Sequence, residues 1–145
     1  MKTKQISVFI ENRAGRLASV ARVLKEEGID IRALSMADAP DFGIFRIVVE
    51  DTERARAALR QRGFVTEVSD VVAVEVEDRP GGLADVLAVF AEHGLNVEYM
   101  YAFLTERNGR AIIFFRFEDT DRAVEVLRAA GLPLVYGDRL WRAVR

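Results

Sequence analysis

The chain of 145 residues contains two copies of one sequence unit of about 70 residues. Residues 11–17 (ENRAGRL) match residues 77–83 (EDRPGGL) at a shift of 66. Residues 50–55 (EDTERA) match the segment EDTDRA, which begins at Glu118, at a shift of 68. The two extra residues lie between the matched blocks, where a turn is expected. Because the matches follow in the same order, the chain is predicted to fold as two similar units rather than as one larger domain.

Each copy has the hydrophobic pattern of a β-α-β-β-α-β unit. Ile6, Val8 and Ile10 alternate with Gln5 and Ser7, which is typical of a strand with one covered face. Apolar residues then recur at helical spacing up to a glycine, which suits the position after a helix end. In the first copy we expect strands at 6–10, 29–36, 44–49 and 65–68, with helices over 17–28 and 51–63. In the second copy we expect strands at 72–76, 95–104, 111–117 and 134–136, with helices over 83–94 and 119–131.

This order of elements predicts an α+β protein made of two ferredoxin-like βαββαβ sandwiches with antiparallel sheets, because crossover connections are right-handed. The two predicted domains are residues 1–69 and 70–145. Only Ser69 and Asp70 separate the last strand of the first copy from the first strand of the second. A junction this short predicts that the two sandwiches pack side by side rather than hang on a flexible linker.

The composition excludes several kinds of chemistry. With no cysteine and one histidine, the chain can form no disulfide, no thiolate metal site and no histidine-rich zinc site. The 21 basic and 23 acidic residues nearly balance, whereas a nucleic-acid binder usually has a basic excess. There is neither a signal-peptide pattern nor a long apolar span. We therefore expect a cytoplasmic protein that binds no nucleic acid, membrane, metal or cofactor.

A glycine-containing loop joins the first strand to the first helix in both copies. Glycine lets the backbone turn sharply, and the start of a helix leaves N–H groups that suit a carboxylate. The side chains of Asn12 and Asp78 offer oxygen acceptors for an ammonium group. Together these groups are complementary to a zwitterionic amino acid. The same pattern also caps ordinary strand-to-helix turns, so both interpretations stay open.

The loop and the segment that follows the first helix resemble those of ACT domains, small regulatory modules that bind amino acids or similar effectors. The second copy has the loop DRPGGL at 78–83 and the segment GLNV at 94–97. The first copy departs from this pattern at Asn12, Ala14 and Asp30. The resemblance covers residues 4 to 144 and is greatest to the stand-alone tandem ACT proteins of bacteria and archaea. It leaves no segment for a catalytic domain, so we expect a binding protein and not an enzyme.

The resemblance also implies where a ligand binds, because ACT ligands sit between paired units, where the loop of one unit faces strand 2 of its neighbour. One candidate site consists of Asn12, Ala14, Gly15, Arg16 and Leu17 together with Asn96 and Val97. The reciprocal site consists of Asp78, Pro80, Gly81, Gly82 and Leu83 together with Asp30 and Ile31. The departures in the first copy suggest that the two sites are not equivalent. The guanidinium of Arg16 either pairs with a ligand carboxylate or is simply solvated.

The function implied is a small-molecule-binding regulator that senses an amino acid or related carboxylate, forms a homodimer and acts on a partner enzyme. A first alternative is a protein-interaction module without a ligand, in which the alternating Tyr99, Tyr101 and Phe103 contact a partner or a second chain. A second alternative is a small ferredoxin-like hydrolase such as an acylphosphatase, with Arg13 or Arg79 in its phosphate loop.

Overall fold

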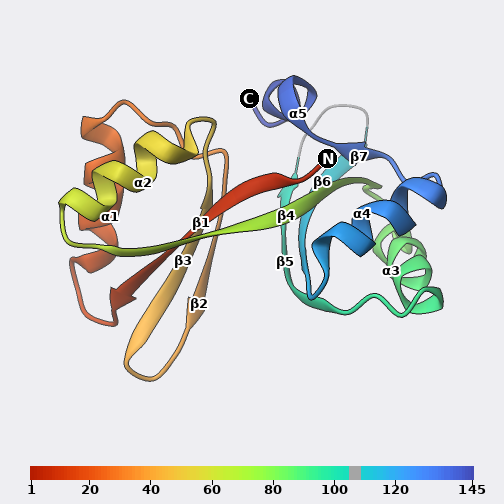
Figure 1. The fold of residues 1–145 in the computed structure, drawn as a ribbon, viewed down its shortest axis with the longest axis horizontal. Coiled ribbons are helices and arrows are strands. Elements are labelled where there is room, and N and C mark those ends of the chain that lie inside the picture. The colour runs from red at the N-terminus through yellow and green to blue at the C-terminus, as the bar shows by residue number, and fades with distance from the viewer. Residues whose placement is uncertain (105–108) are drawn as a thin grey trace. The chain divides into compact units, whose positions relative to one another are not determined.

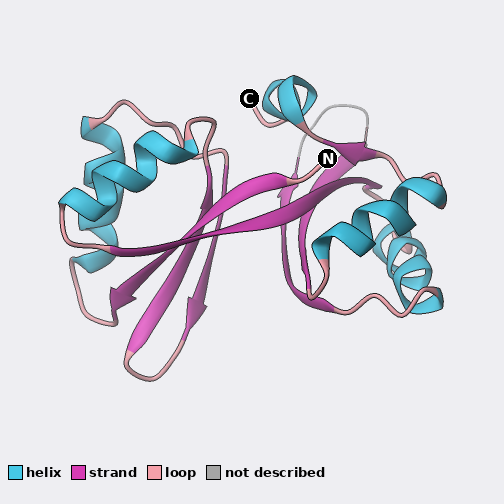
Figure 2. Cartoon of the chain, viewed as in Figure 1, coloured by secondary structure: helices cyan, strands magenta, loops and turns pink. Residues whose placement is uncertain are grey.

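The computed structural model describes residues 1–104 and 109–145 and divides the chain into two compact units (Figure 1). The N-terminal unit is Lys4–Ser69, and the C-terminal unit is Asp70–Arg145 together with Met1–Thr3. In each unit two helices lie against one face of an antiparallel sheet (Figure 2). The α+β content and the antiparallel βαββαβ-like order predicted from the sequence are therefore confirmed.

The N-terminal unit has the strand order β2-β3-β1, with both pairings antiparallel. Its elements are β1 (Thr3–Glu11), α1 (Arg16–Glu26), β2 (Ala33–Asp38), β3 (Phe42–Val48), α2 (Thr52–Gln61) and the start of β4 (Val65–Glu77). Val8 and Ile47 of the sheet pack with Leu24 of α1 and Leu59 of α2, and all four are buried. The alternation in β1 and the helical spacing in α1 thus produce one apolar core between sheet and helices.

The C-terminal unit has the strand order β5-β6-β4-β7, again antiparallel. Its elements after β4 are α3 (Gly82–Glu92), β5 (Val97–Leu104), β6 (Arg110–Phe117), α4 (Thr120–Ala129), β7 (Leu134–Val135) and α5 (Gly137–Ala143). Phe90 of α3 lies at the centre of the core. Its ring centroid is 4.9 Å from that of Phe115 and 5.1 Å from that of Phe117, both edge-on. This aromatic cluster joins α3 to β6.

Two elements differ from the sequence prediction. The predicted strands 65–68 and 72–76 form one strand, β4, of 13 residues, because no glycine or proline interrupts the segment and Ser69 and Asp70 extend as strand residues. The short helix α5 was not predicted. It buries Leu140 and Val144, which are four residues apart, and two such positions are too few for a recognisable helical period.

The aromatic row of β5 is not an exposed surface. Met100 pairs across the strands with the core residue Phe115, whereas Tyr101 pairs with Phe114 and so points to the opposite face of the sheet. Tyr101 is only 8% exposed and stacks on Phe114 at a centroid distance of 5.4 Å. The protein-interaction alternative relied on this row. Its central residue, Tyr101, is buried within the chain and is therefore not accessible to a partner.

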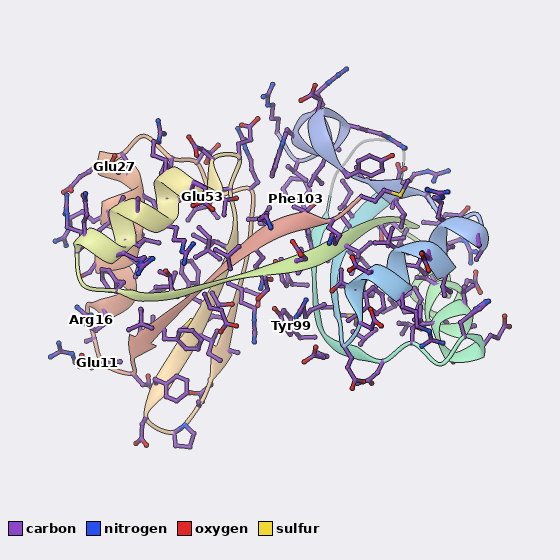
Figure 3. The ribbon with its side chains drawn as sticks, in the orientation of Figure 1. Glu11, Arg16, Glu27, Glu53, Tyr99 and Phe103 are labelled. Atoms are coloured by element: carbon purple, nitrogen blue, oxygen red, sulfur yellow. The ribbon has the colours of Figure 1, made fainter. Side chains whose placement is uncertain are left out.

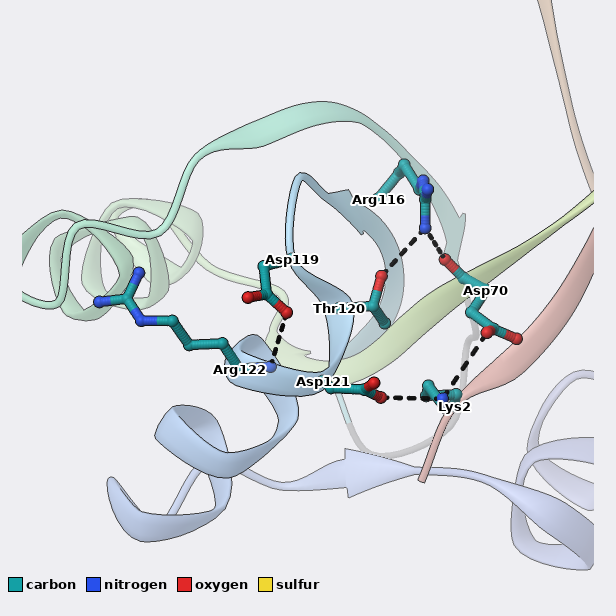
Figure 4. Close-up of polar contacts among 7 residues, drawn as sticks. All are labelled: Lys2, Asp70, Arg116, Asp119, Thr120, Asp121 and Arg122. Atoms are coloured by element: carbon teal, nitrogen blue, oxygen red, sulfur yellow. Dashed lines mark hydrogen bonds and ion pairs between the residues drawn. The ribbon is translucent and has the colours of Figure 1, made fainter.

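Helices α2 and α4 begin at equivalent aspartates, as the repeated sequence predicts. The carboxylates of Asp51 and Asp119 accept hydrogen bonds from the backbone N–H groups of Arg54 and Arg122, at 3.1 Å in both cases. Figure 4 shows the second of these caps. The aspartates of the two repeated EDT segments therefore start these helices.

The first residues of the chain are held to the C-terminal unit by Lys2. Its Nζ lies 2.8 Å from Oδ1 of Asp121 and 3.7 Å from Oδ2 of Asp70 (Figure 4). The hydrogen bond and the charge of Lys2 lower the pKa of Asp121, and the same contact raises the pKa of Lys2. Any stability from Asp121 is thus present above the ordinary carboxyl pKa and is lost as the pH falls through its lowered pKa.

We expect an NMR titration of the Asp121 carboxyl to give a pKa below the ordinary aspartate value in the wild-type chain. Lys2→Met should return that pKa to the ordinary value, because the hydrogen bond and the positive charge are both removed. Added salt should reduce the difference in the wild-type chain, since both groups are exposed to solvent. An unchanged titration of Asp121 in Lys2→Met would contradict the contact.

Candidate functional site

Both glycine loops turn through a left-handed residue immediately before a helix. Gly15 has φ 89° and Gly81 has φ 88°, a region that residues with a side chain rarely adopt. Each glycine is the N-cap, so neither α1 nor α3 receives a side-chain cap. The capping interpretation of Asn12 and Asp78 is therefore wrong. The N–H groups of Arg16 and Gly82 donate to the carbonyls of Arg13 and Arg79, and the next N–H groups of each first turn remain suited to an anion.

The other predicted loop residues lie at the surface. Asn12, Ala14 and Pro80 are exposed, Leu17 is 42% exposed, and Leu83 is half-buried. In the part of the chain that the structure describes, the side chains of Asn12 and Asp78 make no hydrogen bond with another protein group. Their oxygens therefore remain available beside the uncapped helix starts.

The two loop arginines are held by carboxylates. Arg13 Nε lies 2.9 Å from Oε2 of Glu11. At the equivalent place Arg79 pairs with Glu77 and with Asp85, whose Oδ2 is 2.7 Å from Nη2. The hydrogen bonds with Glu77 and Asp85 raise the pKa of Arg79. Because two carboxylates already neutralise this guanidinium, the loop is a poor phosphate cradle, which weighs against the acylphosphatase alternative.

Equivalent positions 16 and 82 differ between the units. The guanidinium carbon of Arg16 lies 4.7 Å from the ring centroid of Phe64, a cation–π contact, and Arg16 Nε is buried without a hydrogen bond. The guanidinium thus packs on Phe64, and its pairing with a ligand carboxylate stays a prediction. Gly82 is buried, and a Cβ at this position would lie 2.1 Å from the carbonyl oxygen of Glu77. Only glycine lets α3 approach the end of β4 this closely.

A cavity of about 250 Å³ opens beside Gly82 within the C-terminal unit. Val86, Leu132 and Pro133 contribute to its apolar side, and its charged residues are Glu75, Glu77, Arg79, Asp85 and Arg110. The sequence analysis missed Glu75, Arg110 and the three apolar residues as site residues. A comparison of the two copies could have drawn attention to Glu75 and Arg110, because these charged residues align with the apolar Phe9 and Phe42 of the first copy.

The strand-2 residues of the prediction lie at the other end of each unit. Figure 3 labels Arg16 at the start of α1 and Glu27 at its end, and Asp30 and Ile31 follow Glu27. An 11-residue helix spans about 16 Å, so one unit by itself keeps its loop and its strand-2 residues apart. The predicted combinations draw the two groups from different units, and they remain predictions.

The strand-2 residues line a second pair of equivalent pockets. Asp30 contributes to one of about 330 Å³ and Asn96 to one of about 220 Å³, whereas neither includes Ile31 or Val97. In each pocket an arginine of the second helix binds the end of the first helix. Arg54 Nη2 donates to the Glu27 carbonyl at 3.1 Å, and Arg122 Nη2 donates to the His93 carbonyl at 2.7 Å. In both units, therefore, an arginine of the second helix satisfies a backbone carbonyl at the C-terminal end of the first helix.

Two βαββαβ units, each with a helix that begins behind a left-handed glycine without a side-chain cap, define a tandem α+β protein of the ferredoxin-like class. A family model described as "ACT domain pair" matches residues 1–143. The chain belongs to the ACT domain pair family. No curated protein matches the chain.

The chain is also similar to solved structures. Protein BT0572 from Bacteroides thetaiotaomicron is 38% identical, with a TM-score of 0.87 over 93% of this chain and 92% of that one. The regulatory subunit of aspartate kinase from Thermus thermophilus, in a ligand-free form, is 20% identical, with a TM-score of 0.63 over 88% and 91% of the two chains. The corresponding subunit from Thermus flavus is 21% identical, with a TM-score of 0.64 over 89% and 90%. The two Thermus proteins share the fold of this chain.

Among the residues described, no helix has both the length and the apolar character needed to cross a membrane. Within the same residues, no group of three histidine or carboxylate side chains is arranged to hold a metal ion.

Proposed function

We propose that the chain reversibly binds a small amino acid or a related carboxylate at its glycine loops and thereby regulates a partner enzyme. The observation that carries the proposal is the pair of uncapped helix starts behind Gly15 and Gly81. Their N–H groups suit a carboxylate, and the unbonded oxygens of Asn12 and Asp78 suit an ammonium group. Membership of a family of regulatory ligand-binding modules supports the same conclusion.

The proposal includes pairing of ACT units, within one chain or between two copies, so that a loop meets strand 2 of its neighbour. It also includes a homodimer. Support comes from the exposed apolar residues of β2 and β5, each of which has one paired strand within its unit. Leu34 is 54% exposed, Met36 49% and Met100 42%. Apolar residues on an open strand edge are typical of a surface that another chain covers.

Regulation requires that the ligand bind one state of the chain better than another. A ligand at a hundredfold excess over its Kd stabilises the state that binds it by about 2.7 kcal/mol. The partner enzyme must distinguish the same two states, because allosteric coupling is reciprocal. Two solved structures that share the fold of this chain are described as regulatory subunits of aspartate kinase, which supports a role beside an enzyme.

A thermal-shift screen of the twenty amino acids tests the proposal. At a hundredfold excess over Kd, we expect at least one of them to raise the Tm by roughly 5–10 °C. Asp78→Ala should remove most of this shift if the ligand uses the second loop, and Asn12→Ala should do so if it uses the first. Asp41→Ala, which changes an exposed carboxylate in the turn before β3, serves as the control. If no amino acid raises the Tm at millimolar concentration, the proposed function is wrong.

A further inference from the structure

The two glycine loops differ in how their arginine is held. In the second loop all three guanidinium nitrogens of Arg79 are engaged. Nε pairs with Glu77 at the end of β4, and Nη1 donates to the Pro80 carbonyl at 3.1 Å. Nη2 lies 2.7 Å from Oδ2 of Asp85 in the first turn of α3, and a Cβ placed on Gly81 would lie 3.4 Å from Nη1. The guanidinium thus forms a clamp that joins the strand end to the helix start across Gly81.

The first loop has no such clamp among the residues that the structure describes. Arg13, at the equivalent position, pairs through Nε with Glu11 at 2.9 Å. The place of Asp85 is taken by Ser19, a neutral residue whose hydroxyl donates to the Gly15 carbonyl at 2.9 Å. The arginine of the first loop is therefore held from the strand and is not joined to the first turn of α1.

The charges around the two helix starts differ in the same direction. Residues 11–19 contain two arginines and one glutamate, whereas residues 77–85 contain one arginine and three acidic residues. The first turn of α1 contains no acidic residue, and that of α3 contains Asp85. An acidic side chain there interacts with the same positive helix end as a ligand carboxylate would. Asp78, in place of Asn12, attracts the ammonium group of a ligand but does not assist its carboxylate.

We propose that the Arg79 clamp is an autoinhibitory contact, so that an amino acid occupies the first loop at a lower concentration than the second. A carboxylate that reaches the first turn of α3 has to displace Arg79 from Asp85 or lie beside the Asp85 charge. Each ion pair of the clamp is partly exposed and contributes little alone, so the expected effect on the ligand Kd is about threefold to tenfold. The inference rests on the proposed function and adds the order in which the two loops fill.

A titration of the full chain with glycine, followed by amide NMR spectra at constant ionic strength, tests the inference. Glycine is the probe because it carries the two charged groups that amino acids share. We expect the backbone amides of Leu17 and Ala18, in the first turn of α1, to report one Kd and those of Leu83 and Ala84, in the first turn of α3, to report another. The Kd at the first loop should be lower by about threefold or more.

Two exchanges between the copies separate the clamp from the other differences between the loops. Asp85→Ser introduces the residue of the first copy and should lower the glycine Kd of the second loop by about threefold or more, without changing that of the first. Ser19→Asp should raise the Kd of the first loop by a similar factor. Ser19→Asn, which also loses the hydroxyl contact but adds no charge, should not. Glu92→Ser removes an exposed carboxylate from the end of α3 and, as the control, should leave both values unchanged.

Equal Kd values at the two loops of the wild-type chain, or an unchanged second-loop Kd in Asp85→Ser, would overturn the inference and leave the proposed function standing. Glycine shifts at neither loop would also overturn the inference alone if another amino acid raises the Tm in the thermal-shift screen. If no amino acid has an effect in either experiment, the inference and the proposed function are both wrong.

Discussion

Phe90→Ala is expected to lower the free energy of unfolding of the C-terminal unit by about 4 kcal/mol. Phe90 is 2% exposed and contacts the rings of Phe115 and Phe117 edge-on. Alanine would lose the transfer free energy of the ring, two aromatic contacts, and the packing of the walls of the resulting cavity. For a unit of this size, such a loss is a large fraction of the total stability.

Urea unfolding followed by the fluorescence of Trp141 measures the effect, since this single tryptophan lies in α5 of the C-terminal unit. Phe90→Leu is the matched control and should cost about 1–1.5 kcal/mol, because it keeps most of the apolar volume. A loss below about 1 kcal/mol for Phe90→Ala would show that the core collapses around the missing ring, contrary to the packing described.

Gly82→Ala is expected to lower the free energy of unfolding by about 3 kcal/mol. The added Cβ would lie 2.1 Å from the carbonyl oxygen of Glu77 and 3.2 Å from its carbonyl carbon, and a backbone obstacle cannot rotate away. Helix propensity alone predicts the opposite sign, since alanine in a helix is more favourable than glycine by about 0.5–1 kcal/mol. A lower free energy of unfolding would therefore indicate the close approach of α3 and β4, whereas a higher one would indicate that local helix preference dominates.

The same urea titration measures this change, with Arg16→Ala as the control at the repeat-equivalent position. Far-UV circular dichroism is followed as well, because Trp141 reports the C-terminal unit and Arg16 lies in the N-terminal unit. Arg16→Ala should cost about 1 kcal/mol, because it removes the cation–π contact with Phe64 without creating a clash. If Gly82→Ala unfolds at the same urea concentration as the wild-type chain or a higher one, α3 can move away from β4 and the close approach is not required.

Local signals in the sequence predicted most of the secondary structure. The alternation around Val8, the helical spacing around Leu24 and the helices predicted to begin at Asp51 and Asp119 all correspond to observed elements. The prediction of separate strands at 65–68 and 72–76 was wrong because a short polar pair between two apolar runs can continue a strand as readily as interrupt it.

The candidate site was predictable only in part. The loops and their glycines were predicted from the repeat and from the resemblance to ACT domains. Glu75 and Arg110 were not, because they lie 35 positions apart in the chain and come together only through the register of β4 and β6. No local pattern marks two charged residues on neighbouring strands as the wall of a cavity.

The sequence by itself determined that this protein is a duplicated pair of βαββαβ units with a glycine loop in each. Periodicity, caps and turns act over a few residues, and the duplication shows each of them twice. The tertiary structure decided how the equivalent positions 16 and 82 are used in the two units. That outcome depends on the approach of α3 to β4 at Gly82 and on the direction of the Arg16 side chain over Phe64. Arg16 and Phe64 lie 48 positions apart, and the approach of Gly82 to Glu77 depends on how α3 packs against β4, so packing determines both.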